Sequence, residues 1–193
     1  MEMRFFKLKF KFLICLTFFC TPLFATINIL NIEGNLEAKS NPKCIPMSEA
    51  VASLTPPDLA LGILECYKGD EVQNALDMFW VMKVRAFFDA QRVKDESAGA
   101  AQGALQAELF AVTGEDFLIE MQDLLDKDKE AFFSRLCAMM KTLGAPNYYP
   151  KYMILHGMNA FLGIEGDGLK PNFDADREWG KILRNNLSCK DKN

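Results

Sequence analysis

The only histidine of this 193-residue chain, His156, limits the chemistry that the sequence can support. A zinc site built from several histidines is excluded, and the H-E-x-x-H pattern of metalloproteases does not occur. His156 could still act as a general base toward a serine or cysteine, although the chain has no G-x-S-x-G elbow. On a predicted helix over 150–162 it shares a face with Met153, Gly157 and Ala160. That position is equally typical of a packed histidine with one hydrogen bond.

Charged residues on one predicted helix give the second set of candidates. Lys83 falls among apolar positions when residues are counted at 100° each, so it either extends its stem to the surface or points into a pocket toward a carboxylate. The other side of the helix carries charges at i, i+3 and i, i+4 spacing: Arg85, Asp89, Arg92 and Glu96. Such a ladder is typical of a solvated face. Arginines on a rigid helix could alternatively hold a carboxylate in bidentate fashion.

Two neighbouring tyrosines, Tyr148 and Tyr149, lie between predicted helices. They either pack on the core or contact a partner, since tyrosine is common in binding hot spots. The glycines of the loop 163–168 (GIEGDG) resemble a phosphate-binding loop, but its acids would repel phosphate and the Walker lysine is missing. A calcium site would use the acids Glu165, Asp167, Asp174 and Asp176. Their spacing departs from that of an EF-hand, so we predict neither a metal nor a cofactor.

The first 25 residues have the order of a cleaved secretory signal. A basic region comes first, formed by Arg4, Lys7, Lys9 and Lys11. The apolar stretch 12–20 follows, and then Pro22 and the small residue Ala25. This stretch is too short to cross a bilayer about 30 Å thick as a helix. We therefore expect a mature chain that begins near Thr26, carries no stable membrane anchor and is periplasmic or secreted.

Four of the six cysteines lie beyond this signal, and their spacing excludes the close pairs of a metal site. An even number of cysteines in an exported chain indicates disulfides, and four allow three pairings. Sequence alone does not choose between them. We prefer Cys44–Cys66 with Cys137–Cys189, because each bond would tie an irregular end of the chain to a helix.

The charge balance becomes more acidic without the signal. The whole chain has 22 basic and 26 acidic side chains, and the signal holds four of the bases and one of the acids. The mature chain therefore has 18 basic and 25 acidic side chains, a net charge of about −7. This charge disfavours binding to nucleic acid and to anionic lipid, and it attracts a basic protein.

Helical periodicity dominates the mature chain, and no segment shows the alternation of a strand. Residues 26–56 form an irregular N-terminal arm with a short helix at 47–54. Residues 57–193 predict one all-α domain, a compact bundle of six to seven helices with an N-terminal helical hairpin. The expected helices cover 57–69, 71–96, 98–112, 115–125, 129–143, 150–162 and 174–187. Small residues in 98–112, Gly99 and Gly103 among them, would allow a neighbouring helix to approach closely.

The hairpin contains the run LGILECYKGDEVQNAL, with Leu61, Gly62, Tyr67, Gly69 and Ala75. This run resembles the helix-turn-helix unit of tetratricopeptide repeats over one unit of about 30 residues. Its spacing from tyrosine to glycine is shorter than in that family, and no second copy follows. Such repeats need about three units to bury a continuous core. The resemblance therefore implies a helical hairpin and no repeat array.

The chain has no recognisable catalytic set. We therefore expect an exported, non-enzymatic protein that binds a protein partner in the cell envelope, with an immunity-type inhibitor of a basic enzyme as its most concrete form. The residues expected to contact the partner are Lys83, Arg85, Asp89, Arg92, Tyr148, Tyr149 and His156. Two alternatives stay open. One is an envelope hydrolase that uses acidic residues or His156, and the other is a secreted effector or carrier of a small ligand or lipid.

Overall fold

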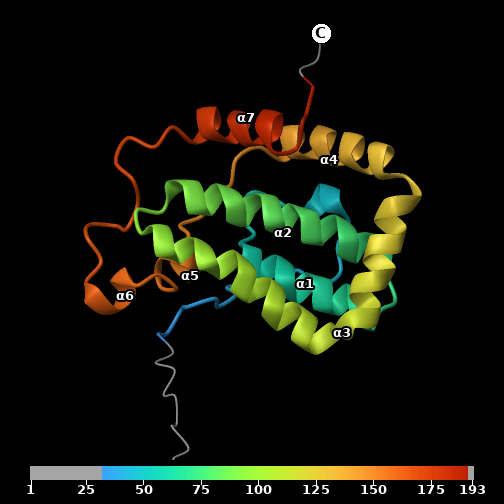
Figure 1. The fold of residues 1–193 in the computed structure, drawn as a ribbon, viewed down its shortest axis with the longest axis horizontal. Helices are drawn as coiled ribbons and strands as arrows, with labels where there is room; N and C mark the ends of the chain where they lie inside the picture. Colours follow the sequence, from blue (N-terminus) through green and yellow to red (C-terminus); the bar gives the residue numbers. More distant parts are fainter. Residues whose placement is uncertain (1–31, 191–193) are drawn as a thin grey trace, which may run out of the picture. The chain divides into compact units, whose positions relative to one another are not determined.

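A computed structural model describes residues 32–190 of the chain (Figure 1). The expected signal, 1–25, and the first residues of the expected arm, 26–31, lie outside the described residues. Within them the elements are η1 (Met47–Glu49), α1 (Pro56–Lys68), α2 (Val72–Arg92), η2 (Glu96–Ala100), α3 (Ala101–Lys127), α4 (Lys129–Leu143), α5 (Lys151–Ile154), α6 (Asn159–Leu162) and α7 (Ala175–Asn185). The described part is an all-α bundle, as the sequence predicts, and its isolated β-bridge joins Val93 to Leu169.

A capping box starts α1. The Thr55 hydroxyl accepts a hydrogen bond from the Asp58 amide, and the Asp58 carboxylate accepts one from the Thr55 amide at 2.8 Å. The same carboxylate accepts the amides of Lys39 and Ser40, both at 2.7 Å. Asp58 therefore fixes the start of the helix and the path of the N-terminal arm together.

Helix α2 is the centre of the bundle and is buried on most of its circumference. It packs against α1, α3, α4 and α7, and Figure 1 shows α4 and α7 on one side of it and α1 and α3 on the other. Gly62 allows α1 to come close, because a Cβ at this position would lie 2.2 Å from the terminal methyl of Met78 on α2. Gly99 lies near Ala90 of α2, whereas Gly103 has no neighbour within 4 Å of a built Cβ, so only the first of these glycines lies where a helix approaches.

Two disulfides hold the ends of the described chain to helices. Cys44 of the arm is bonded to Cys66 of α1, and Cys137 of α4 is bonded to Cys189, which follows α7. These are the two pairs preferred from the sequence, and the structure confirms them. Among residues 32–190, every helix is too short or too polar to span a bilayer.

Helix α3 is interrupted at Gly114, whose backbone (φ 79°, ψ 177°) is not helical. This break falls between the two helices predicted at 98–112 and 115–125, and the structure joins them as two arms of one kinked element. The short helix predicted at 47–54 is reduced to the three residues of η1.

The helix predicted over 150–162 is wrong. Two short helices, α5 and α6, replace it. The amides of Met158 and Asn159 donate instead to the side chains of Ser97 and Asp95, at 2.9 and 2.7 Å. A continuous helix would direct these amides to the preceding turn, so the contact with 95–97 breaks it.

Candidate functional site

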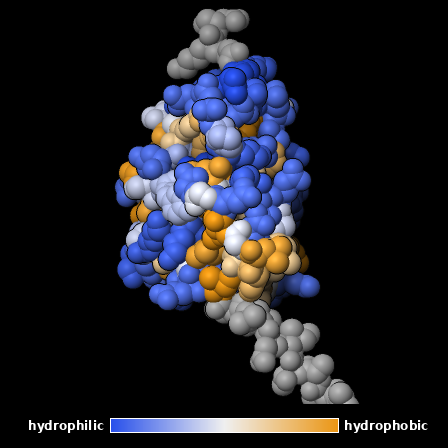
Figure 2. All heavy atoms as spheres, turned by 90° about the vertical axis from the view of Figure 1, so that its left-hand side faces the viewer, coloured by the Kyte–Doolittle hydropathy of each residue, from blue (hydrophilic) through white to orange (hydrophobic). Residues whose placement is uncertain are grey.

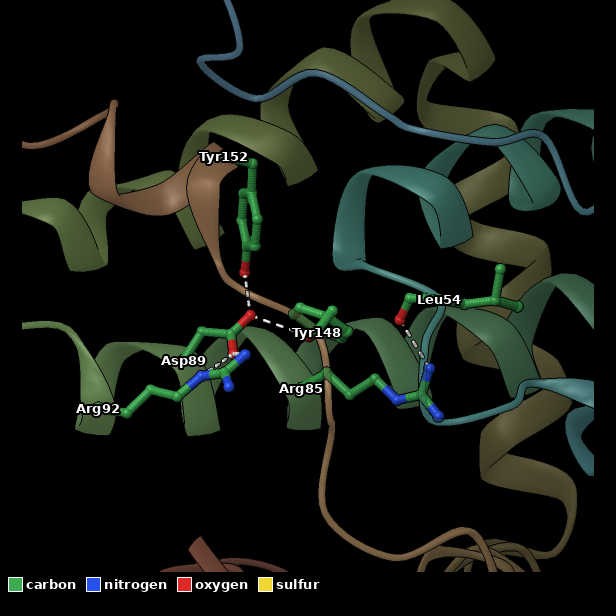
Figure 3. Close-up of polar contacts among 6 residues, drawn as sticks. All are labelled: Leu54, Arg85, Asp89, Arg92, Tyr148 and Tyr152. Carbon is green, nitrogen blue, oxygen red and sulfur yellow. Dashed lines mark hydrogen bonds and ion pairs between the residues drawn. The ribbon is translucent and has the colours of Figure 1, made fainter. Parts of the chain in front are cut away.

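A buried carboxylate, Asp89, contacts two of the residues that the sequence singles out, Arg92 and Tyr148, and also Tyr152 (Figure 3). Its Oδ1 accepts from Nε of Arg92 at 2.9 Å and forms an ion pair with Nη2 of Arg92 at 2.7 Å. Its Oδ2 accepts the hydroxyls of Tyr148 and Tyr152 at 2.9 and 2.7 Å. The side chain of Asp89 has no exposed surface. Both of its oxygens therefore have donors, as a buried carboxylate requires.

Arg85, one turn earlier on α2, is also buried but does not pair with Asp89. Its guanidinium donates to three backbone carbonyls of the segment before α1, those of Ala50, Val51 and Leu54. The bonds to Val51 and Leu54 are 3.0 and 2.8 Å long. Arg85 therefore fastens an irregular segment to the central helix (Figure 3).

Burial governs the electrostatics of this cluster. Burial raises the pKa of Asp89. The Arg92 guanidinium and the two tyrosine hydroxyls act in the opposite direction, but the pKa stays above its ordinary value. Burial and the neighbouring Asp89 carboxylate hold the pKa of Tyr148 and of Tyr152 well above the ordinary 10.0. Both phenols therefore stay protonated and act as donors.

We expect alkaline pH to unfold the protein through these two tyrosines. Because their pKa is raised in the folded state, their contribution to stability is complete below about pH 10 and is lost as the pH rises beyond it. Tyrosinate absorbance followed together with far-UV circular dichroism should show Tyr148 and Tyr152 ionising only as the helices melt. A Tyr148→Phe/Tyr152→Phe variant should lose that coupled step. Ionisation of both tyrosines in a fully helical protein would contradict the expectation.

The solvated ladder expected on α2 is therefore wrong. Arg85, Asp89 and Arg92 are 1%, 0% and 9% exposed, and Tyr148 is 8% exposed. The helical periodicity predicts that the apolar side of α2 faces the core and that the charged side faces solvent. In the structure α2 is central, so other elements cover both sides. These four residues hold the fold together and have too little surface to form the expected contact with a partner.

Lys83 lies on the least buried side of α2. Its ammonium group is 4.6 Å from the ring centroid of Trp80 and 5.5 Å from that of Phe79. Partial burial lowers the pKa of Lys83. The stem thus runs over aromatic rings toward the surface, and the described residues show no carboxylate paired with it.

The remaining candidates lie outside the Asp89 cluster. Tyr149 is exposed and its hydroxyl donates to the carbonyl of Asp167 at 2.7 Å, while Nδ1 of half-buried His156 is 3.0 Å from Oδ1 of Asn35. Three of the four acids of the calcium hypothesis have other partners: Glu165 pairs with Lys94, Asp167 accepts the Leu169 amide and Asp174 caps α7. Within the described range no group of three or more such ligands converges.

The structure points instead to an exposed apolar surface at α6. Four large side chains, which we call the α6 patch, stand out of the surface: Met158 (57% exposed), Phe161 (52%), Leu162 (77%) and Ile164 (39%). Figure 2 looks onto the end of the bundle at which α6 lies, and it shows hydrophobic residues gathered low on this face with hydrophilic ones around them. Adjacent apolar residues exposed in this way mark interaction sites.

Specific polar contacts hold the segment that carries the α6 patch. The Asp95 carboxylate accepts the Asn159 amide at 2.7 Å, and the Ser97 hydroxyl accepts the Met158 amide at 2.9 Å. Partial burial raises the pKa of Asp95, and the bonds from Ser97 and Asn159 outweigh it to give a lowered value. Gly157 makes this approach possible, since a Cβ there would lie 2.4 Å from the Asp95 carboxylate.

The far end of the segment is fixed to the end of α2. The Lys94 amide donates to the carbonyl of Gly168 at 2.8 Å, and the Lys170 amide donates to that of Arg92 at 2.9 Å. Gly168 packs on Ile154, and its φ of 75° suits glycine. Residues 157–168 are therefore anchored at both ends, and the α6 patch is presented on a defined backbone.

Comparison with known proteins gives no relative. No family model, curated protein or solved structure matches the chain. The function must therefore be argued from this geometry.

Sequence reasoning missed the α6 patch because Met158, Phe161 and Leu162 have the i, i+3, i+4 spacing of a buried helix face. The signal that could have identified it is the glycine content of the flanks, at Gly157 and Gly163, which makes a continuous helix unfavourable. The contact with Asp95, 60 or more residues distant in the chain, is not visible in any local pattern.

Proposed function

We propose that the chain is an exported, non-enzymatic protein that binds a basic protein of the cell envelope, as an immunity-type inhibitor does. The observation that carries the proposal is the α6 patch. Its four apolar side chains are exposed on a backbone that is already fixed, so a partner can bury them at a low cost in conformational entropy.

Two further observations support export and the charge of the partner. Both disulfides favour an oxidising compartment, in agreement with the signal pattern of residues 1–25. All four cysteines of residues 32–190 form these two disulfides, so none of them has a free thiol that His156 could activate. The excess of acidic side chains over basic ones favours a basic partner and would speed its association.

Removing the apolar groups of the α6 patch should weaken partner binding. We expect Phe161→Ser/Leu162→Ser to raise the Kd about tenfold or more, since buried apolar anchors each contribute more than about 1 kcal/mol to such interfaces. The partner is first captured from envelope extracts with the oxidised protein and identified by mass spectrometry. The Kd is then measured with purified partner by calorimetry, and inhibition of the partner's activity is measured in parallel.

A matched control uses two exposed apolar residues elsewhere on the surface. Val112 and Ile119 of α3 are 65% and 55% exposed, so Val112→Ser/Ile119→Ser removes similar groups away from α6. This control should bind as the unchanged protein does. Equal losses in both variants, or a partner that binds both normally, would contradict the proposal.

A further inference from the structure

A cavity of about 290 Å³ lies where the turn between α1 and α2 meets the kink of α3. This region is at the right-hand end of Figure 1, whereas α6 is at the left. The cavity, which we call the Tyr67 pocket, is lined by Tyr67, Asp70, Gly114, Asp116, Phe117 and Glu120, with Val72 and Thr113. The break in α3 at Gly114 contributes directly to its wall.

The aromatic wall of the pocket is open to a ligand. Tyr67 is 41% exposed and is braced edge-on by buried Phe117, with 4.9 Å between the ring centroids. Elsewhere the chain places its own cations on aromatic rings: Lys83 on Trp80, Arg92 on Phe88 and Tyr148, and Arg135 on Phe132. Among the described residues no lysine or arginine occupies the ring of Tyr67.

Three carboxylates line the same pocket. The side chains of Asp70, Asp116 and Glu120 are exposed, and within residues 32–190 none of them takes part in a hydrogen bond or an ion pair. The nearest basic residue in sequence, Lys68, is paired with Glu65 at 2.8 Å. The rest of α3 adds to the negative potential, because beyond Asp116 and Glu120 it has four more acids, all of them exposed, and one lysine.

We infer that the Tyr67 pocket receives the cationic side chain of a lysine or arginine from a basic protein. A guanidinium or ammonium group gains from an aromatic face and from nearby carboxylates at once, and this pocket offers both, with no cation among the described residues that line it. The inference rests on the proposed function for the source of the cation. The site itself is separate, because the 21 residues of α2, about 30 Å long, divide it from the α6 patch.

The probe is acetyl-Gly-Arg-Gly-amide, with its neutral citrulline analogue as the ligand control. Both are titrated into the purified, disulfide-bonded protein and followed by amide chemical shifts. We expect the arginine peptide to bind weakly, with a roughly millimolar Kd, and to shift the amides of 67–72 and 113–120. Added salt should weaken it, and the citrulline peptide should leave these amides unchanged.

The test variant is Asp116→Asn/Glu120→Gln, and its control is Glu115→Gln/Asp123→Asn. Both remove two charges from α3 by the same two chemistries, but Glu115 and Asp123 do not line the pocket. The test variant should raise the Kd about tenfold and the control less than about twofold. Tyr67→Phe should retain binding and Tyr67→Leu should lose it, since only the former keeps the ring.

Equal weakening by both double variants would show a general charge effect and overturn the inference. Equal shifts with the citrulline peptide would overturn it as well. Neither result touches the α6 patch, so partner capture through that patch would stand. If the peptide binds as expected while no protein is captured, the pocket is a cation site and a protein is the wrong source of the cation.

Discussion

Asp89→Asn should cost about 3–5 kcal/mol of the free energy of unfolding, because it leaves the buried Arg92 without its counter-charge. The amide also replaces one of the two accepting oxygens by a group that donates, so this group faces either Arg92 or the two tyrosine hydroxyls. Such a loss is a large part of the roughly 5–15 kcal/mol that stabilises a domain. Urea unfolding followed by tryptophan fluorescence measures it, since Trp179 packs on Phe88 next to this cluster.

Two further variants make the Asp89 result specific. Asp123→Asn, the same change at an exposed position of α3, should alter stability by less than about 0.5 kcal/mol. Tyr152→Phe, which removes one hydrogen bond to the carboxylate, should lower the free energy of unfolding by about 1.5–3 kcal/mol. This smaller loss can still be measured if Asp89→Asn does not fold. A cost below about 1 kcal/mol for Asp89→Asn in a folded protein would show that the ion pair is not needed.

Removing the disulfides should give the second large effect, and the two bonds should differ. Closure of a loop of 52 residues by Cys137–Cys189 predicts a loss of about 4 kcal/mol, and the 22-residue separation of Cys44–Cys66 predicts about 3 kcal/mol. Paired substitution by alanine avoids a new buried hydroxyl at Cys66, which is fully buried. The midpoint of urea unfolding, measured for each paired alanine variant and for the variant without either disulfide, shows which bond contributes more to stability.

Reduction of the unchanged protein is the internal control for these variants. Each alanine pair should make the protein insensitive to reduction of one bond, and the variant without either bond should not respond to reductant at all. A larger loss for Cys44–Cys66 than for Cys137–Cys189 would contradict the loop-length argument. If the predicted losses hold, folding depends on an oxidising compartment.

Most of the helices were predictable because they follow from local patterns. Pro57, Gly69 and Gly144 mark helix ends at positions that the structure retains. The disulfide pairing was a preference among three, based on tying irregular ends of the chain to helices, and the structure has that pairing. Local patterns failed where a distant partner intervenes. Asp95 takes the amide that a helix over 150–162 would have used, and no spacing within that segment reveals it.

The candidate site was harder to predict, because burial of charge depends on how many sides of a helix are covered. Arg85, Asp89 and Arg92 have the spacing of a solvated ladder, and only the position of α2 at the centre of the bundle buries them. Met158, Phe161 and Leu162 have the spacing of a buried helix face, whereas the structure exposes all three. Tyr149 and His156 have partners of their own, Asp167 and Asn35, and do not join the buried cluster.

The contacts of Arg85 also determine which substitutions the segment before α1 can accept over evolutionary time. The guanidinium binds main-chain oxygens at residues 50, 51 and 54, which every amino acid supplies. The side chain of Val51 points largely to solvent, so this position is free to diverge while its backbone stays in place. Arg85 has no such freedom, since lysine, with a single nitrogen, cannot reproduce the fork that spans three carbonyls. Among homologues of this chain, variation should therefore gather at 51 and be absent at 85.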